Sequence, residues 1–586
     1  MPFRSTILFL LAALAAAQPP APIYYTVRIP APQTHYAEVE ARFPTGGRRQ
    51  IEVMMAVWTP YVIREYARNL EGVTARTADG RPLAIEKSRK NRWRIETGGA
   101  DPAVVSYRVY CHVMNVQDNW VDQDFALLNG APTFLTLADH VARPHDVRLV
   151  LPADWKASDT GMPRAPGGGA HHYRAADYEM LVDSPIVAGN PAVHEFTVDG
   201  KRHYLVDAGE DGVFDGDRAA GDLARIVRTD ERVWGSLPYQ AYFFLNILTG
   251  GGGGGGMEHS NSTALMSSRW GTRTHRAYLR WLELASHEFF HTWNVKRLRP
   301  AELKPGEYET EEYTTSLGIA EGFTSYYAPV ILHRAGLSTD EELLADLSRM
   351  IRELQTTPGR LVQTLSMSSF DTWIKFYHPD ENSVNTSISY YTKGAVAGFL
   401  LDARVREATH GAKTLDDVMR LALAHNPMTR GYTPEAFRAA ASAVAGTDLK
   451  GWFAKVFDST RELDYQPALD WFGLRFAEEP ASGRAWLGAG TEDAGGRLVV
   501  TRIPRGTPAY EAGLDAGDEI VGLDGFRMPA GGWETLLGDY GPGDRVTLLI
   551  ARRGRLRKVT VTLGKEPAED WNLEVAAPAA GHRAAW

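Results

Sequence analysis

The sequence predicts a multidomain α+β protein with three folded parts: an N-terminal antiparallel β domain, a mainly helical central domain and a small C-terminal domain of short strands. Three observations support this prediction. Apolar and polar residues alternate in short segments to about residue 207, apolar residues recur at helical spacing from about 276 to 474, and short strands with Gly-Asp turns follow from 483. With 586 residues, 44% of them hydrophobic, the chain can fill several cores.

The first residues have the layout of a secretory signal peptide. Arg4 precedes an apolar run of about eleven residues, which ends in three alanines that suit a cleavage site before Gln18. That run is too short to cross a bilayer, and no later stretch approaches the ~20 apolar residues that a spanning helix needs. We therefore expect a signal peptide over residues 1–17 and an exported protein, periplasmic or secreted, with no membrane contact after cleavage.

The charge of the chain argues against one class of partner. The formal net charge is −9 and the pI is near 6.0. Binding to nucleic acid relies on a basic surface, so we expect no nucleic-acid partner.

Residues 23–207 are predicted to form the antiparallel β domain. Turn residues (Gly, Pro, Asp and Asn) separate segments that alternate apolar with polar residues. Examples are IYYTVRI, YAEVEARF, RQIEVMMAVW, VVSYRVYCHV and HDVRLVLP.

Residues 208–475 are predicted to form the central domain. It opens with one helical segment, AAGDLARIVRTDERVWGSL, and one buried strand, QAYFFLNIL. Several segments with apolar residues at helical spacing follow, which predicts a mainly helical remainder. They include LRWLELASHEFFHTWNV, EELLADLSRMIRELQTT, GAVAGFLLDARVREATHG and TLDDVMRLALAHN.

The segment ASHEFFHTW carries the strongest chemical signal. His287 and His291 stand four residues apart, so one helix face can present both imidazoles to one ion. A zinc ion with three protein ligands keeps one position for water, whose pKa it lowers to about 7. Glu288 is placed to accept the proton of that water as it attacks a carbonyl. The flanking residues are apolar on most sides, which indicates a buried helix, and buried histidines need a strong partner such as a metal.

The third ligand is expected on a following helix. Glu321 is an acid among apolar residues in GIAEGFTSYYAPVIL and suits that position. The alternative is a glutamate at a helix start that only complements the helix dipole.

Seven consecutive glycines, Gly250–Gly256, stand directly before Met257-Glu258-His259 and after the predicted buried strand. Such a run is typical of a linker, but glycine also lets a backbone lie close to a bound peptide. We expect a mobile flap over the first four glycines and an ordered strand that includes Gly255 and Gly256.

The segments HEFFHTWNVKRLRP and EGFTSYY resemble the glycyl aminopeptidase family of zinc metallopeptidases, and AVWTPYVIREYARNLEGVTA resembles the N-terminal domain of that family. The resemblance implies a thermolysin-like catalytic domain with one zinc ion bound by His287, His291 and Glu321, and Glu288 as general base. Thermolysin itself has an aspartate four residues after its ligand glutamate, where this chain has Ser325. The partners that orient the two histidines are therefore not identified by the resemblance.

Two further roles follow from resemblance to zinc aminopeptidases. SISYYTKGAVAGFLL resembles their tyrosine-x-lysine-glycine stretch, which implies Tyr391 as the donor to the oxyanion, with Tyr390 as the alternative. GGMEH resembles their Gly-x-Met-Glu-Asn strand, with His259 in place of asparagine. It implies that Gly255, Gly256 and Met257 line the substrate and that Glu258 binds the free α-amino group.

The C-terminal segments RAWLGAG and IPRGTPAYEAGLDAGDEIVGLDG resemble a bacterial-type PDZ domain, here over residues 483–567. The resemblance implies that Trp486-Leu487-Gly488 form a loop for the C-terminal carboxylate of a peptide. A purely structural PDZ domain is the alternative, and the tail at 568–586 is expected to contribute little.

Together these features predict an exported zinc aminopeptidase that removes small N-terminal residues, such as glycine and alanine, from peptides. The size preference is implied by the resemblance alone. One alternative is a thermolysin-like endopeptidase in which Glu258 is structural. The other is a peptide-binding PDZ scaffold with a vestigial zinc site.

Overall fold

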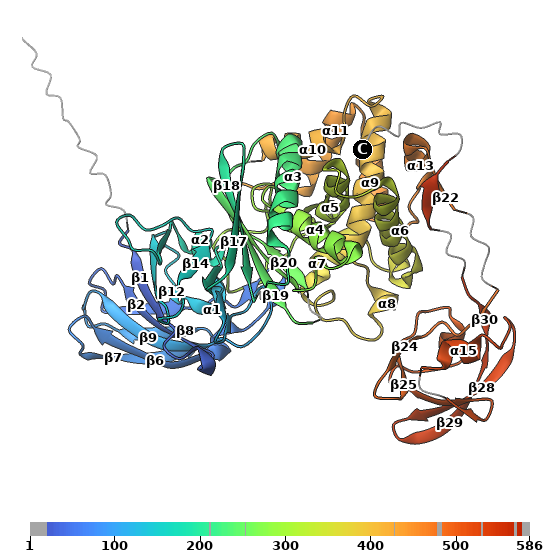
Figure 1. Cartoon of the computed structure of the whole chain (residues 1–586), viewed down its shortest axis with the longest axis horizontal. Helices are drawn as coiled ribbons and strands as arrows, with labels where there is room; N and C mark the ends of the chain where they lie inside the picture. Colours follow the sequence, from blue (N-terminus) through green and yellow to red (C-terminus); the bar gives the residue numbers. More distant parts are fainter. Residues whose placement is uncertain are drawn as a thin grey trace, which may run out of the picture.

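The computed structural model describes residues 20–209, 212–251, 254–426, 428–477, 483–528, 531–567 and 571–576. The expected signal peptide lies outside these ranges. Figure 1 shows an N-terminal β domain in blue, a central part of sheet and helices in green to orange, and a C-terminal β domain in red, arranged in sequence order along the long axis. Within the described ranges, no helix is both long and apolar enough to cross a membrane.

The N-terminal domain is built on a ten-stranded sheet, which confirms the predicted β domain. Its strand order is β12-β3-β8-β7-β6-β9-β2-β1-β13-β15, and β1 with β13 is its parallel pair. In β2 every second side chain is buried, as the alternating pattern requires. The strands are β1 (Ile23–Arg28), β2 (Tyr36–Phe43), β3 (Gln50–Met54), β6 (Leu70–Thr77), β7 (Pro82–Arg89), β8 (Arg92–Glu96), β9 (Ala103–Tyr110), β12 (Thr136–Leu137), β13 (His145–Val150) and β15 (His172–Ala175).

Smaller elements complete this domain. A second sheet has the order β10-β11-β16-β14, and a two-stranded hairpin, β4-β5, stands apart from both sheets. The bounds are β4 (Trp58–Thr59), β5 (Val62–Ile63), β10 (Trp120–Val121), β11 (Phe125–Leu128), α1 (Gly130–Thr133), β14 (Ala157–Thr160), α2 (Tyr178–Val182) and β16 (Ile186–Gly189).

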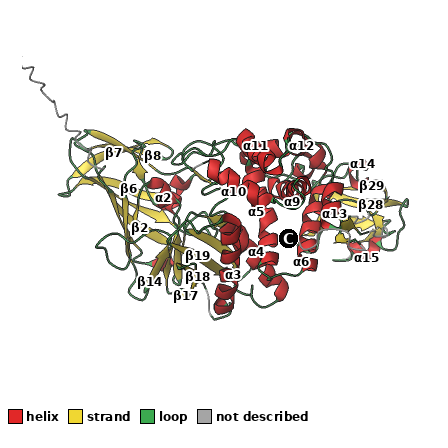
Figure 2. Cartoon of the chain, turned by 90° about the horizontal axis from the view of Figure 1, so that it is seen from above, coloured by secondary structure: helices red, strands yellow, loops and turns green. Residues whose placement is uncertain are grey.

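A five-stranded sheet of order β17-β18-β19-β21-β20 lies between the N-terminal domain and the helices. Side chains of β19 and β21 pack on one face against Phe125 and Val187 of the N-terminal domain, and on the other face against α3 and α4. Figure 2 shows these helices beside the sheet. The elements are β17 (Ala192–Val198), β18 (Lys201–Ala208), α3 (Gly216–Trp234), β19 (Ala241–Thr249), β20 (Gly255–Glu258), β21 (Ser262–Ser268) and α4 (His275–Phe290).

The strands β17 and β18 belong to the five-stranded sheet. The sequence had predicted them as part of one β domain over residues 23–207. They pair with each other, and β18 pairs with β19 in parallel through the crossover helix α3. Alternation of apolar and polar residues identifies a half-buried strand, but it does not tell which sheet the strand joins. The sheet of the central domain therefore begins at Ala192.

Helices form the remainder of the central domain, as their apolar periodicity predicts. Several start at a side-chain cap, such as Thr339 with Glu342 in a capping box. They are a π-helical turn η3 (Gly318–Gly322), α5 (Phe323–Arg334), α6 (Asp340–Thr356), α7 (Leu365–Phe370), α8 (Ser383–Thr386), α9 (Tyr390–Ala408), α10 (Leu415–His425), α11 (Pro434–Ala445), α12 (Lys450–Val456) and α13 (Gln466–Phe472).

Two glycines bring η3 and α9 into close contact. A Cβ atom on Gly322 would lie 2.4 Å from the Cα of Gly394, and one on Gly394 would lie 2.5 Å from the backbone oxygen of Gly318. Only glycine permits this approach. The contact sets Glu321 of η3 near the first turn of α9, which contains Tyr391.

The C-terminal domain has a sheet of order β24-β25-β26-β28-β29, as expected for the predicted PDZ domain. The side chain of Asn385, in the central domain, forms two hydrogen bonds with the backbone of the C-terminal domain. Its Nδ2 donates to the Ile503 oxygen at 2.9 Å, and the Arg505 N–H donates to its Oδ1 at 2.6 Å. Its elements are β23 (Ala485–Trp486), β24 (Gly490–Asp493), β25 (Leu498–Arg502), α14 (Pro508–Glu511), β26 (Glu519–Leu523), β27 (Phe526–Arg527), α15 (Trp533–Leu537), β28 (Arg545–Arg552), β29 (Arg555–Thr562) and β30 (Gly564–Lys565).

The described part of the C-terminal tail returns to the central domain. β31 (Leu573–Val575) pairs with β22 (Leu474–Phe476), and the Leu573 N–H donates to the Ser348 hydroxyl of α6 at 2.8 Å. The sequence analysis expected the tail to contribute little. The strand β31 was not predicted because a three-residue strand is too short for sequence patterns to detect. The PDZ domain is thus tethered to the central domain at both ends.

Asp230 of α3 is buried in the central core without a hydrogen-bond partner on either carboxylate oxygen among the described residues. Burial raises the pKa of this carboxyl well above its usual range, Arg334 opposes that rise and Asp416 adds to it. A raised folded-state pKa contributes stability at acid pH that is lost as the pH rises through that pKa.

We therefore expect Asp230→Asn to stabilise the central domain at pH 8 by about 1–3 kcal/mol, because the neutral amide avoids the desolvation cost of a buried negative charge. The measurement is the melting temperature of the variant and the wild type at pH 8 and at pH 4, where the two should converge. A variant that melts below the wild type at pH 8 contradicts this interpretation.

Candidate active site

The histidines and the glutamate singled out from the sequence meet in one cluster. His287 and His291 lie at the C-terminal end of α4, with their Nε2 atoms 3.1 Å apart. Glu321 of η3 places Oε2 at 3.6 Å from the first Nε2 and at 3.1 Å from the second. The apolar flanks of α4 bury the helix end, so all three donors lie at a largely enclosed position.

Asn294, three residues after His291, orients two of these groups. Its backbone oxygen lies 2.6 Å from Nδ1 of His291, so this Nδ1–H donates there and the lone pair of Nε2 faces the cluster. Its side-chain Nδ2 donates to the backbone oxygens of Ile319 and Ala320 at 3.0 Å each. One residue thus fixes the tautomer of a histidine and the position of the turn that carries Glu321.

The other histidine has a weaker partner. Nδ1 of His287 lies 3.5 Å from the Ser325 hydroxyl, which donates to the backbone oxygen of Glu321 at 2.9 Å. The first distance is at the limit of a hydrogen bond.

The donor set fits a zinc ion. Two nitrogens bound to one tetrahedral zinc, each at 2.0–2.1 Å, lie about 3.3 Å apart, close to the separation seen here. The cluster also attracts positive charge: burial alone lowers the pKa of His291, but the Glu321 carboxylate reverses this and raises the pKa to about 10. A histidine pair with a carboxylate is a typical ligand set for zinc.

Glu288 lies beside the cluster under the backbone of β20. A Cβ atom on Gly256 would lie 2.2 Å from its carboxylate oxygen, so glycine is needed where the strand crosses the glutamate. Glu288 is 6% exposed. Burial raises its pKa well above the usual range, His291 opposes this, and the charges of Glu258 and Glu321 add to the rise. Such a carboxylate has a strong tendency to take up a proton.

Glu258 ends β20, the edge strand of the five-stranded sheet, whose outer edge pairs with no other strand in the described ranges and so can pair with an extended peptide. A carboxylate oxygen of Glu258, one of Glu288 and a ring nitrogen of His291 all lie within 4.8 Å of one another. The glycines Gly255 and Gly256 and Met257 line the same cavity. Of the expected flap, Gly250 and Gly251 are exposed, and residues 252 and 253 lie outside the described ranges.

Asp183 of the N-terminal domain fixes the turn after Glu258. It accepts hydrogen bonds from the Ser260 N–H at 2.9 Å, from Nδ1 of His259 at 3.2 Å, and from Nζ of Lys296 at 2.6 Å. Lys296 lies five residues after His291. The substrate strand and the segment after the metal helix are therefore held by one carboxylate.

The two adjacent tyrosines lie in different environments. The Tyr391 ring lines the cavity, with its centroid 6.2 Å from that of His287, and its hydroxyl lies 3.4 Å from the Tyr377 hydroxyl. Tyr390 is fully buried, and its hydroxyl accepts a hydrogen bond from Thr372 at 3.2 Å. Of the pair, Tyr391 is the one placed to contact a substrate.

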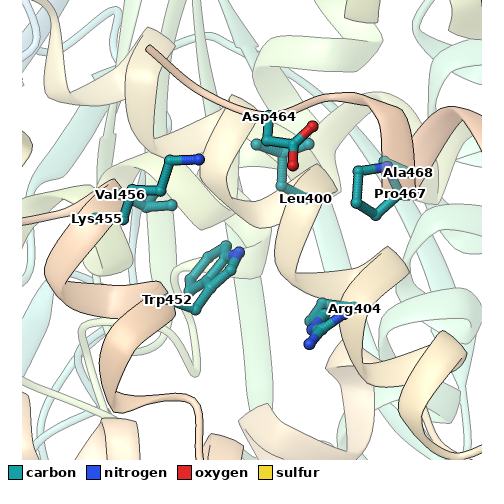
Figure 3. Close-up of a pocket in the computed structure, with 8 residues that line it drawn as sticks. All are labelled: Leu400, Arg404, Trp452, Lys455, Val456, Asp464, Pro467 and Ala468. Atoms are coloured by element: carbon teal, nitrogen blue, oxygen red, sulfur yellow. The ribbon is translucent and has the colours of Figure 1, made fainter. Parts of the chain in front are cut away.

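These residues line a cavity of about 1210 Å³ that continues along α4 and α6. The N-terminal domain closes one part of it with Pro60, Tyr61 and Gln117. A second cavity, of about 230 Å³, lies between α9, α12 and α13 (Figure 3). It contains no histidine, so the chemistry belongs to the larger cavity. The lining of the small one is Leu400, Arg404, Trp452, Lys455, Val456, Asp464, Pro467 and Ala468.

Three residues at the site were not found from the sequence: Tyr61, Asp183 and Asn294. The first two belong to the N-terminal domain and reach the site only through the docking of the two domains. Asn294 could have been noticed, since an amide three residues after a predicted ligand histidine is a candidate to orient it.

One cavity thus contains a cluster of two histidines and a glutamate, a second glutamate beside it and an edge strand. These features define a metal-dependent peptidase. Models of known families match this arrangement: Peptidase M61 N-terminal domain over residues 24–190, M61 glycyl aminopeptidase over 280–397, and PDZ domain over 485–563. The chain belongs to the M61 glycyl aminopeptidase family and is a metallo-aminopeptidase.

Two solved structures resemble this chain to different extents. An aminopeptidase N family protein from Idiomarina loihiensis is 30% identical over 95% of this chain and 98% of that chain, with a TM-score of 0.89. An M1 zinc metallopeptidase from Deinococcus radiodurans is 12% identical over 76% of this chain and 94% of that chain, with a TM-score of 0.48.

Curated relatives match only a short part of the chain. A probable periplasmic serine endoprotease, DegP-like, from Hahella chejuensis is 34% identical over 73 residues, 12% of this chain. One of the same description from Halomonas elongata is 34% identical over 98 residues, 17% of this chain. The chain spans 16% and 20% of the lengths of these two relatives.

Proposed function

We propose that the chain is an exported aminopeptidase that holds one zinc ion and removes small N-terminal residues, such as glycine and alanine, from peptides. His287, His291 and Glu321 would bind the ion. The observation that carries the proposal is the grouping of Glu258, Glu288 and His291 within 4.8 Å, which sets an anchor for an amino group next to a general base. Export is supported by the signal-peptide layout of residues 1–17.

When bound, zinc lowers the pKa of water and polarises a carbonyl group. Glu288 accepts the proton of the attacking water and later gives it to the leaving amine, a role that suits a buried carboxylate with a raised pKa. The Tyr391 hydroxyl donates to the oxyanion as the carbonyl becomes tetrahedral. Asn294 keeps His291 in the tautomer whose Nε2 faces the cluster.

Glu258 makes the enzyme an exopeptidase. Its carboxylate binds the α-amino group of a peptide that pairs with the free edge of β20. Since Glu258 lies so close to Glu288, only the first peptide bond reaches the general base.

The PDZ domain is proposed to receive the C-terminal carboxylate of a peptide at Trp486-Leu487-Gly488. This loop lies against the start of α14, where the Ala509 N–H donates to the Leu487 oxygen at 2.9 Å. The backbone N–H groups of such a loop suit a carboxylate.

A blocked substrate tests the proposal. Glycine p-nitroanilide should be hydrolysed at least about 10²-fold more efficiently than N-acetylglycine p-nitroanilide, because acetylation removes the charge that Glu258 binds. The measurement is kcat/KM for both substrates, before and after removal of the metal with a chelator. Equal rates on the two substrates would favour the endopeptidase, and rates that survive the chelator would exclude a metal mechanism.

A further inference from the structure

The hairpin β4-β5 of the N-terminal domain inserts a tyrosine into the active-site cavity. Thr59 and Val62 pair across a two-residue turn of Pro60 and Tyr61, and both turn residues line the cavity. The Tyr61 side chain is 5% exposed and packs with the core of the central domain. Its hydroxyl donates to Oε1 of Glu321 at 3.3 Å.

The backbone of Tyr61 has an unfavourable conformation. Its φ is 63°, in the left-handed region, at a turn position after proline where glycine or asparagine is favoured. An aromatic residue there costs of order 1–3 kcal/mol, and such strain is concentrated at functional sites. A turn that needed only to connect two strands would have no reason to keep a tyrosine.

The hairpin is held firmly on both sides. The Val57 N–H donates to the Tyr308 oxygen at 2.7 Å, and the Trp58 ring packs edge-on against Trp373 with ring centroids 5.2 Å apart. Both partners belong to the central domain. The segment that leads into Tyr61 is therefore fixed against the central domain.

The position of Tyr61 relates it to the first residue of a substrate. Its hydroxyl contacts Glu321, and Tyr61 and Glu258 line the same cavity. In the proposed function the α-amino group lies at Glu258 and the scissile carbonyl lies at the cluster of Glu321. The Cα atom between these two groups then faces the Tyr61 ring.

We propose that Tyr61, supplied by the N-terminal domain, is the specificity-determining wall that limits the N-terminal side chain of the substrate to small residues. This inference rests on the proposed function. Glycine places no atom against the ring and alanine one methyl group, whereas leucine or phenylalanine requires the space that the ring fills.

The test compares three variants with the wild type. Tyr61→Gly removes the ring and suits the left-handed φ, so it should fold. Tyr61→Phe keeps the ring and removes the hydroxyl. Glu65→Gly is the matched control, since Glu65 has a φ of 55° beside the same hairpin but does not line the cavity.

We expect Tyr61→Gly to raise the ratio of kcat/KM for leucine p-nitroanilide over glycine p-nitroanilide by at least about tenfold, in the range that pocket size controls. Tyr61→Phe and Glu65→Gly should keep the wild-type ratio. An unchanged ratio in Tyr61→Gly overturns the proposal, as does an equal rise in Glu65→Gly.

A binding measurement separates this proposal from the proposed function. Calorimetric affinities for glycinamide and leucinamide need no turnover, and Tyr61→Gly should improve the affinity for leucinamide relative to glycinamide by a similar factor. If no variant hydrolyses an unblocked substrate, the proposed function fails while this comparison still decides the role of Tyr61. Equal relative affinities in wild type and variant refute it.

Discussion

Replacement of Glu288 by glutamine should lower kcat/KM for glycine p-nitroanilide by about 10⁴-fold, the upper end of the contribution of one general base. The large effect is expected because the same carboxylate both accepts the proton of water and protonates the leaving amine. Glutamine has nearly the same shape and fits under Gly256, so the position of β20 should not change. The measurement is kcat/KM together with the zinc content of the purified variant.

The zinc content decides how this result is interpreted. Glu288 is not one of the three proposed ligands, so the variant should retain one zinc ion per chain. Glu341→Gln is a suitable control, because Glu341 is exposed on α6 and does not line the cavity. Activity within about tenfold of the wild type in Glu288→Gln, with zinc bound, would contradict the proposed mechanism.

Glu258→Gln should lower kcat/KM for unblocked glycine p-nitroanilide by about 10²- to 10³-fold, the usual cost when one partner of a buried charge pair is removed. The rate on N-acetylglycine p-nitroanilide should change little, because that substrate has no charged amino group. The preference for unblocked peptides should therefore largely disappear in the variant. The measurement is the ratio of kcat/KM for the two substrates in variant and wild type.

A uniform loss on both substrates would instead indicate a structural role for Glu258. The zinc content is the control here too, because Glu258 lies within reach of His291. A variant that retains zinc and still prefers the unblocked substrate as strongly as the wild type would refute the role of Glu258 as the anchor of the amino group.

Local features of the site could be predicted from the sequence. The spacing of His287 and His291 fixes their common helix face, and Glu288 follows from its place between them. The cluster with Glu321 depends on the placement of η3 beside the end of α4, where Asn294 donates to the backbone oxygens of Ile319 and Ala320, and this placement cannot be derived from the sequence. Glu321 was nevertheless singled out as an acid among apolar residues on a following helix, whereas the roles of Glu258 and Tyr391 came from resemblance to known families.

Features that depend on how domains meet could not be predicted. Asp183 and Tyr61 belong to a domain that the sequence describes only as alternating strands, and their contacts with Ser260 and Glu321 span 77 and 260 residues of sequence. The positive φ of Tyr61 leaves no trace in composition or periodicity. The sequence predicted an ordered strand that includes Gly255 and Gly256, but the close approach of Gly256 to Glu288 became apparent only in three dimensions.

A crystal structure of zinc-loaded Glu288→Gln with a bound Gly-Gly dipeptide would test the central claim most directly. The account predicts one metal ion among His287, His291 and Glu321, the α-amino nitrogen within about 3 Å of a Glu258 carboxylate oxygen, and the dipeptide paired with β20. A dipeptide whose α-amino group lies away from Glu258, with its chain able to continue past Tyr61, would contradict the assignment as an aminopeptidase.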